Sequence, residues 1–418
     1  MNSSACHDMN SSLLDGNKRS FDVNSSAPDM NSNLWPDFEE RSGFFFQLAR
    51  DLRAHISLEE KPFFCLALSG GIDSLVLFTF LVWLRHMENL PFLALHFNHG
   101  LRGDTDAEES QFIRELCVRY AVPLREGRAD VRALAAERGA GLEEAARFAR
   151  HRFFDEELAS VTEKLRLQAS FRPFTEDRQE EPLKSAAALK QSRPRSFTVS
   201  RQEKSLESPQ PPVFLVLGHH LNDRAETIIL QMTRGTGLKG LCAMPYRDGS
   251  KLRPLLLTER SRIEAFARES GLLYCEDESN FEDDFLRNRV RHQLLPLWQD
   301  ISERPLYRQL SDLAENLEEE NALLEDEARA ALDRLLLGSG ALNLKALLQL
   351  HPGLYYRVIS LWLAKALNAG PSDELRVLPR KTWLSLRKKL EELPTSAQFD
   401  LPGGRRLLLR DFRLELEE

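Results

Sequence analysis

The sequence predicts an α/β protein with a doubly wound parallel sheet, followed by a mainly α-helical C-terminal domain. Short apolar runs alternate with segments of helical periodicity from about residue 43 to residue 300, and helical periodicity prevails after about residue 305. Strands separated by helices favour parallel pairing. Ligands of such sheets bind beyond the carboxyl ends of the strands. Three polar or glycine-rich loops follow expected strands, so we expect them to converge on one crevice: 69–74, 96–103 and 218–227.

Helices are expected where apolar residues recur every three to four positions, and strands where a short apolar run stands between turn signals. The expected strands of the α/β region are 63–68, 92–97, 122–126 and 213–217. Its expected helices are 44–55, 72–85, 105–120, 130–138, 142–158 and 223–233, with a further helix-like run at 285–298. The C-terminal domain is expected to contain helices at about 305–337, 343–350, 354–368 and 379–392, and then a glycine turn and a strand within 399–416.

The composition limits the class of protein and its compartment. The net charge of −8 argues against bulk affinity for nucleic acid and leaves that role to local basic patches. No apolar run is long enough to span a membrane, and the N-terminus has no apolar signal segment, so we expect a cytoplasmic protein without a membrane partner. The five cysteines form no Cys-x-x-Cys pair, which indicates neither a zinc site nor a disulfide framework.

Two segments depart from the α/β pattern. Residues 1–40 are rich in Ser and Asn, contain a degenerate repeat, and predict a disordered tail. Residues 163–212 contain six prolines and many polar residues, and predict a flexible insertion in the α/β domain. A solvated linker and an RNA-contacting segment are both open interpretations of this insertion.

The first strong motif is the run SGGIDS, which follows an apolar strand and opens a helix. Glycines allow close backbone approach, and a helix start presents free N–H groups and a positive dipole end to an anion. No Lys-Ser/Thr pair follows, so the loop is not a Walker A motif. A carboxylate beside a phosphate is plausible with a divalent metal between them, which makes Asp73 the candidate ligand. The expected anion-binding residues are Ser69, Gly70, Gly71, Ile72, Asp73 and Ser74, with both serine hydroxyls as donors.

The second strong motif is GHHLNDRAET, in which Asp223 and Glu226 lie on one face of an expected helix. A helix cap at Asp223, completed by Glu226, would explain the same spacing. The glycine-rich, basic run that follows, 234–241, suits a loop near an anionic ligand. His96 and His99 end the second strand, where a polar rim around a nucleotide fits better than a metal site because no acid or cysteine stands close by.

Taken together, six strings resemble the tRNA(Ile)-lysidine synthase family, a group of pyrophosphatase-loop (PP-loop) ATPases. They are SGGIDS, HFNHGLR, LEEAARFARHRFF, GHHLNDRAETIILQMTRGTGLKGL, RPLL and DESN with RNRVRHQLLP. The resemblance implies an adenine nucleotide alpha-hydrolase-like domain at 41–300 and a tRNA-binding domain at 305–418. It also implies a ligase that uses ATP and magnesium to adenylate C2 of the wobble cytidine in tRNA(Ile) with a CAU anticodon. L-lysine then displaces AMP to form lysidine.

The resemblance also implies roles for individual residues. Asp73, Arg147 and Asp223 become the expected catalytic set, with Asp73 also holding magnesium. The general base for the lysine amine is left open between Asp223 and Glu226. Many members of the family have two acids where this chain has Asn222 and Asp223, which puts a role for the first acid in doubt. Substrate contacts are expected from His99, Glu226, Arg287, Asn288 and Arg291.

Three other functions remain as alternatives. A PP-loop tRNA thiolase would need paired cysteines or an iron–sulfur cluster, which this sequence does not indicate. A small-molecule synthetase of the same fold would not need a basic C-terminal domain. A non-enzymatic RNA-binding protein would not need both strong motifs. The sequence leaves open whether the chain forms a homodimer.

Overall fold

The computed structural model describes residues 38–101, 104–170, 210–275, 285–366, 380–392, 396–401 and 406–417. These residues form two compact units. Unit 1 contains the described residues up to Glu226 together with Met244–Arg308, and unit 2 contains Thr227–Ala243 and the described residues from Gln309 onward. Nearly all of the expected tail lies outside the described residues, except that its last three positions belong to helix α1 (Phe38–His55).

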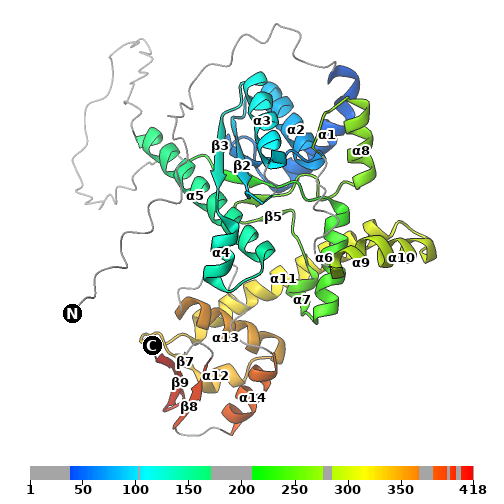
Figure 1. Cartoon of the computed structure of the whole chain (residues 1–418). Coiled ribbons are helices and arrows are strands. Elements are labelled where there is room, and N and C mark those ends of the chain that lie inside the picture. Colours follow the sequence, from blue (N-terminus) through cyan, green and yellow to red (C-terminus); the bar gives the residue numbers. More distant parts are fainter. Residues whose placement is uncertain are drawn as a thin grey trace, which may run out of the picture. The chain divides into compact units, whose positions relative to one another are not determined.

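Unit 1 is built on a six-stranded sheet in the order β3-β2-β1-β4-β6-β5, which confirms the predicted doubly wound α/β fold (Figure 1). Every pairing is parallel except that of β5 with β6. The chain runs outward from β1 to β3 and then returns to β4 on the other side of β1. Since the strand order reverses at β1 and β4, the loops at their carboxyl ends flank the crevice where such folds bind ligands. The strands are β1 (Phe63–Ala67), β2 (Phe92–Asn98), β3 (Leu124–Arg128), β4 (Val213–Val216), β5 (Arg247–Asp248) and β6 (Lys251–Leu252).

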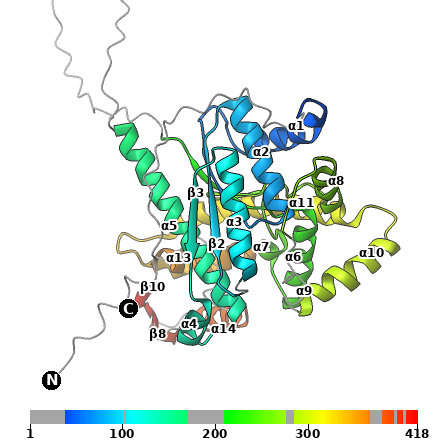
Figure 2. The ribbon, with the colours of Figure 1, turned by 45° about the horizontal axis from the view of Figure 1, so that its top comes forward.

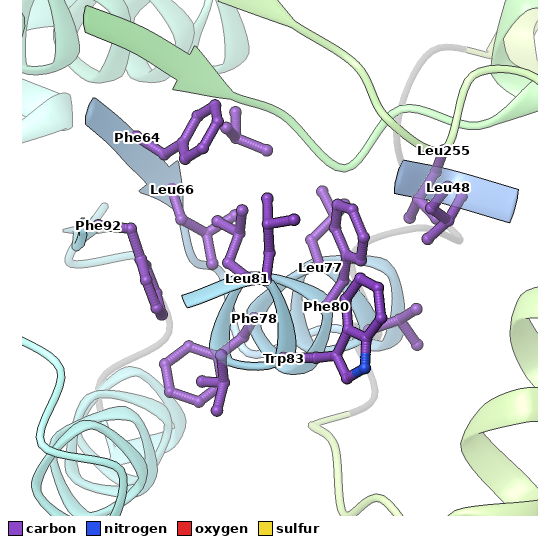
Figure 3. Packing of buried hydrophobic residues seen from close by; sticks show 14 of the residues in the cluster. Leu48, Phe64, Leu66, Leu77, Phe78, Phe80, Leu81, Trp83, Phe92 and Leu255 are labelled. Atoms are coloured by element: carbon purple, nitrogen blue, oxygen red, sulfur yellow. The ribbon is translucent and has the colours of Figure 1, made fainter. Parts of the chain in front are cut away.

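Helices cover both faces of this sheet (Figure 2). One face carries α1, α2, α3 and α8, whose apolar side chains share a core with Phe64, Leu66 and Phe92 of the strands. Figure 3 shows these three strand residues with the side chains of α1 and α2 that pack in the same core. The other face carries α5, which packs Phe153 and Phe154 against apolar strand residues. Residues of β1 and β4 alternate between the two cores, which explains why both strands are apolar throughout. The helices of unit 1 are α1, α2 (Ile72–Glu88), α3 (Asp104–Arg119), α4 (Val131–Arg138), α5 (Leu142–Ser170), the first part of α6 (Leu221–Arg234), α8 (Arg260–Glu269), α9 (Phe285–Arg289), the π-helical turn η2 (Val290–Leu294) and α10 (Leu295–Ile301).

The predicted start of the insertion is wrong, and two short strands were not predicted. Helix α5 continues to Ser170, so 163–170 belong to a helix and not to the expected insertion; 171–209 lie outside the described residues. An i,i+3 ion pair between Glu163 and Arg166 fits this helical extension. Strands β5 and β6 could not be predicted from the sequence, because two residues are too few to show an alternation of apolar and polar side chains.

Unit 2 confirms the predicted helical character and adds a four-stranded antiparallel sheet in the order β7-β10-β9-β8. Leu407, Leu409 and Leu414 point from this sheet into a core with α11, α12, α13 and α14. The expected glycine turn, 403–404, lies outside the described residues. The elements are α7 (Leu238–Leu241), α11 (Leu306–Leu335), α12 (Leu344–Leu348), α13 (Pro352–Ala366), α14 (Arg380–Glu391), β7 (Leu342–Asn343), β8 (Ser396–Asp400), β9 (Arg406–Arg410) and β10 (Arg413–Glu417). None of the helices in the described part of the chain has the length and apolar character needed to cross a membrane.

Candidate active site

The Ser69–Ser74 loop joins β1 to α2 through a sharp turn. Gly70 has a φ of +78°, a conformation that favours glycine, and its carbonyl accepts a hydrogen bond from the Cys275 N–H at 3.0 Å. The Ser74 hydroxyl donates to the Gly71 carbonyl at 2.9 Å and lies 3.3 Å from the Ser69 N–H, for which it is the acceptor. This differs from the expected use of Ser74 as an anion donor, because its hydrogen shapes the loop itself. The N–H groups of the first turn of α2 have no intrahelical acceptor and remain the natural anion donors.

Gly218 brings the loop between β4 and α6 against the Ser69–Ser74 loop. A Cβ at this position would lie 3.3 Å from the Cβ of Asp73 and 3.4 Å from the backbone nitrogen of Ser74. Any larger residue would therefore push the two loops apart. The two strongest sequence motifs consequently meet at one point, as the parallel topology predicts.

His220 lies between the carboxylates of the two loops. Its Nε2 is 4.0 Å from Oδ2 of Asp73 and 3.5 Å from Oδ2 of Asp223. The Asp223 carboxylate accepts a hydrogen bond from the His220 backbone N–H at 3.0 Å, and the Asp223 N–H faces Nδ1 of His220 at 3.4 Å. These reciprocal contacts make His220 the cap and Asp223 the third residue of α6. The alternative sequence interpretation, with Asp223 as the cap and Glu226 completing it, is wrong.

The environments of the two aspartates push their pKa values in opposite directions. Burial raises the pKa of Asp73, and the charge of Asp223 adds to this effect. Burial also opposes ionisation of Asp223, but His220, His219, the backbone hydrogen bond and Arg287 outweigh it, so the pKa of Asp223 is lowered. One buried oxygen of Asp73, Oδ1, has no hydrogen-bond partner. Asp73 is therefore a carboxylate held in a site where its charge lacks full compensation.

His219 adds a second buried polar atom without a partner, its Nδ1. Burial lowers the pKa of His219 to about 4, and the nearby cations Arg253, Arg287 and Arg150 act in the same direction. The ring is therefore neutral near pH 7. Together with Asp73 Oδ1, it leaves two unmet hydrogen-bonding atoms on the facing loops.

Glu226 is by contrast fully engaged by two arginines from α9 and η2. Arg291 donates from Nε to Oε1 at 2.6 Å and from Nη2 to Oε2 at 3.0 Å, and Arg287 donates from Nε to Oε2 at 3.0 Å. The Glu226 side chain is only 2% exposed. Burial disfavours the charged form of Arg291, but its hydrogen bonds to Glu226 raise its pKa. Glu226 thus anchors the distant segment 287–291 to the loop that follows β4.

Three expected site residues stand apart from these contacts. Arg147 lies on the exposed side of α5, where its charge acts with Arg150 and Lys251 on His151, whose pKa is lowered first by burial. His99 follows β2 and packs edge-on against Phe97, with ring centroids 5.1 Å apart. Asn288 is half-buried on α9. The structure brings together Asp73, Asp223, Glu226, Arg287 and Arg291 but does not join Arg147 to them.

Sequence reasoning missed three residues of this region. Gly218 permits the loop contact, His220 lies between the two aspartates, and Asn222 bonds the N-terminus of α8. All three belong to the GHHLNDRAET motif, so the sequence marked this segment as important without indicating what these three residues do. The basic run 234–241 also differs from expectation, because Lys239 pairs with Glu325 of α11 at 3.5 Å within unit 2.

A divalent cation would find a suitable carboxylate in Asp73. The described residues contain no cluster of three or more His, Cys, Asp or Glu side chains arranged to hold a metal ion. Magnesium, however, is commonly held by one or two carboxylates together with substrate phosphates. The partnerless Oδ1 of Asp73, beside a helix start suited to phosphate, fits this mode of binding.

The chain resembles proteins of known activity along most of its length. It is 28% identical over 327 residues to the tRNA(Ile)-lysidine synthase of Geobacillus kaustophilus, a match that covers 77% of this chain and 60% of the relative. It is 32% identical over 270 residues to the enzyme of the same name from Geobacter sulfurreducens, covering 64% and 46%. The chain therefore spans about half to three fifths of the length of these curated relatives.

One solved structure that matches the chain is described as the U34-tRNA thiolase NcsA from Methanococcus maripaludis with its [4Fe-4S] cluster. The match has 14% sequence identity and a TM-score of 0.45, and covers 66% of this chain and 80% of that chain. The family model of the PP-loop domain matches residues 46–172 and 202–298, which is more than half of the chain. These matched segments include the Ser69–Ser74 loop, the GHHLNDRAET motif and the two arginines that bind Glu226. The chain therefore belongs to the PP-loop domain family.

Proposed function

We propose that this chain is a tRNA(Ile)-lysidine synthase, an ATP-dependent ligase that joins lysine to the wobble cytidine of tRNA(Ile). The observation that carries the proposal is the meeting of the Ser69–Ser74 loop with Asp223 and the Glu226–Arg287–Arg291 cluster at one sheet edge. ATP use follows from membership of the PP-loop family. The relatives' names supply tRNA as the substrate class. That lysine is the second substrate and that the tRNA has a CAU anticodon are parts of the proposal.

The first half of the reaction attaches AMP to the C2 oxygen of cytidine and releases pyrophosphate. Charge builds on the α-phosphate and on the leaving pyrophosphate, and preorganised donors are the main way in which proteins stabilise such charge. In this chain the N–H groups at the start of α2 are the proposed donors to the pyrophosphate. Arg287 and Arg291 offer positive charge at the facing loop. Magnesium held by Asp73 would neutralise phosphate charge when bound.

The second half needs a base for the lysine ammonium, which must lose a proton before the amine attacks C2. Both oxygens of Glu226 accept arginine hydrogen bonds, and its side chain is almost completely buried. The Asp223 side chain is 13% exposed, and its lowered pKa favours the ionised form, which can accept a proton. We therefore assign proton acceptance to Asp223 and the positioning of Arg287 and Arg291 to Glu226. AMP is then expelled, and the C2–N bond to lysine remains.

The thiolase alternative is less well supported by the described residues. Sulfur transfer needs accessible, reactive thiolates. Cys65 and Cys117 are buried, and burial raises the pKa of each thiol to about 12. Cys242 is also buried, and Cys275, beside Gly70, is the one described cysteine that is not buried, so the described residues offer no pair of accessible cysteines.

Unit 2 is proposed to bind tRNA. Its surface includes the exposed Lys388 and Lys389 on α14, whereas Arg387 is engaged by Glu391 at 2.8 Å. Arg406 lies between Asp400 and Glu417 on the neighbouring strands. The side chains of three further basic residues of this region lie outside the described set: Arg380, Lys381 and Arg405. The exposed lysines, Lys388 and Lys389, are therefore better phosphate contacts than the paired arginines.

The direct test mixes the protein with ATP, magnesium, radiolabelled lysine and a tRNA(Ile) transcript with a CAU anticodon. Label should enter the RNA only when ATP is present, with one AMP and one pyrophosphate released for each lysine attached. A matched elongator methionine tRNA serves as the specificity control. The proposal fails if ATP is consumed and no lysine is found in the RNA.

A further inference from the structure

The side chain of Asn222 bonds a helix that it does not belong to. Its Oδ1 accepts a hydrogen bond from the backbone N–H of Arg260, the first residue of α8, at 3.0 Å. The residue in the ordinary capping position, Glu259, makes no side-chain cap bond. Asn222 therefore supplies the cap of α8 from the loop that follows β4. The adjacent Leu221 N–H donates to the Thr258 carbonyl at 3.0 Å and fixes the same junction.

Helix α8 connects this junction to the Ser69–Ser74 loop. It buries Ile263 and Phe266 in the core shared with α2, the helix that begins in the loop. The segment that leaves α8 then bonds the loop directly, because the Cys275 N–H donates to the Gly70 carbonyl at 3.0 Å. Arg260 and Glu264 of α8 also act electrostatically on Asp73. A displacement of α8 would consequently reach both the backbone and the carboxylate of the loop.

The amide group of Asn222 has a second partner, since it also hydrogen-bonds the hydroxyl of Tyr307. Tyr307 is the second residue of α11 and lies in unit 1. Asn222 thus ties α6, α8 and the first turn of α11 together. An aspartate at this position could accept from the Arg260 N–H and from the Tyr307 hydroxyl, so an acid would serve the same junction.

We infer that Asn222 is a positioning residue, which holds α8 and through it the Ser69–Ser74 loop in the conformation that receives ATP. That the loop receives ATP rests on the proposed function. That Asn222 holds α8 and the loop rests only on contacts within unit 1. Of the two adjacent polar residues, Asn222 therefore caps α8, and Asp223 accepts the proton in the proposed reaction. Asn222 makes no contact with substrate in this scheme.

Two measurements on the full-length chain test the inference. The variants are Asn222→Leu, which keeps the volume without the polar atoms, and Asn222→Asp, which keeps an acceptor. Asp130→Ala is the matched control, because Asp130 caps α4, a helix that follows β3, through a 3.0 Å bond from the Ala133 N–H. Asn222→Ala replaces Asn222→Leu if the leucine variant does not fold.

Hydrogen exchange without ligand should become at least tenfold faster at residues 260–263 and at 69–75 in Asn222→Leu, and should stay near wild type in Asn222→Asp. Titration calorimetry with ATP and magnesium, without tRNA or lysine, should show at least fivefold weaker binding for Asn222→Leu only. Asp130→Ala should leave both hydrogen exchange at 69–75 and the affinity for ATP unchanged. Unchanged exchange at 69–75 in Asn222→Leu would overturn the inference, as would an Asn222→Asp variant as impaired as Asn222→Leu. Failure of the wild type to bind ATP would instead count against the proposed function, with the exchange result still deciding the role of Asn222.

Discussion

Asp73 and Asp223 stand on facing loops and share His220 as a neighbour, yet the protein treats them differently. Asp73 is buried with a partnerless oxygen and a raised pKa. Asp223 accepts a backbone hydrogen bond, faces two arginines and has a lowered pKa. A folded chain satisfies most of its buried polar groups, so a partnerless carboxylate oxygen beside a helix start suited to anions is a suitable place for a ligand. The difference teaches that the protein itself stabilises the charge of Asp223, whereas Asp73 keeps one carboxylate oxygen without a partner.

The largest effect is expected from Asp73→Asn. Activity should fall by at least about a thousandfold, because the amide cannot replace a carboxylate beside a metal and phosphate. The ligand-free protein should nevertheless become more stable at pH 7, with Tm raised by about 2–4 °C, since an uncompensated buried charge is removed. The raised pKa means that protonation favours the fold, so this gain should shrink as the pH falls toward the ordinary pKa of aspartate. Product assays and thermal unfolding at pH 7 and pH 4 measure both; a variant with near wild-type turnover contradicts the assignment.

Asp223→Asn should show the opposite stability effect. The lowered pKa means that the charged form of Asp223 supports the fold above its ordinary pKa, so the variant should be less stable at pH 7. This deficit should disappear as the pH falls through the lowered pKa of the native aspartate. Lysine transfer should fall by at least about a hundredfold, the range expected for loss of a general base. A rise in Tm at pH 7 would show that the two carboxylates do not differ as described.

Glu226→Gln tests whether Glu226 positions Arg287 and Arg291 or acts as the general base. The glutamine keeps the shape but loses the charge that holds Arg287 and Arg291, so both stability and activity should fall, the latter by about tenfold to a hundredfold. The shape of the pH–rate profile should stay that of the wild type. Arg289→Gln is the control, since Arg289 is exposed on the same helix between the two arginines. If the profile of Glu226→Gln loses its acidic limb while that of Asp223→Asn keeps it, Glu226 is the base.

The smallest effect is expected from Gly218→Ala. The added Cβ would lie 3.3 Å from the Cβ of Asp73, a distance that requires a shift of a few tenths of an ångström between the loops. Turnover should fall by about tenfold, with little change in Tm, because misplacement of reacting groups is costly. Gly141→Ala has open space around its Cβ and should leave turnover unchanged. Equal turnover of the two variants would show that the loop contact is not needed for activity.

Sequence patterns predicted the sheet and both motif loops because these depend on local signals: apolar runs, glycine turns and helix starts. They also predicted that Asp73 and Asp223 lie at one crevice, because both follow strands of a parallel sheet, whose carboxyl ends meet at the same edge. They did not reveal that Glu226 binds Arg287 and Arg291, because these partners are 61 and 65 positions apart. Nor did they predict that Asn222 caps α8, since a side chain that caps another helix leaves no periodic signal. Arg147 entered through family resemblance alone, and its exposed place on α5 leaves its catalytic role a prediction.

The most direct test of the difference between the two aspartates is the magnesium dependence of ATP stabilisation. Thermal unfolding is followed with saturating ATP, with and without magnesium, for the wild type, Asp73→Asn and Asp223→Asn. Magnesium should add several degrees to the ATP-induced rise in Tm of the wild type and of Asp223→Asn, and nothing to that of Asp73→Asn. A magnesium-dependent rise in Asp73→Asn equal to that of the wild type would contradict the conclusion that the partnerless carboxylate of Asp73 is kept for the metal–nucleotide complex.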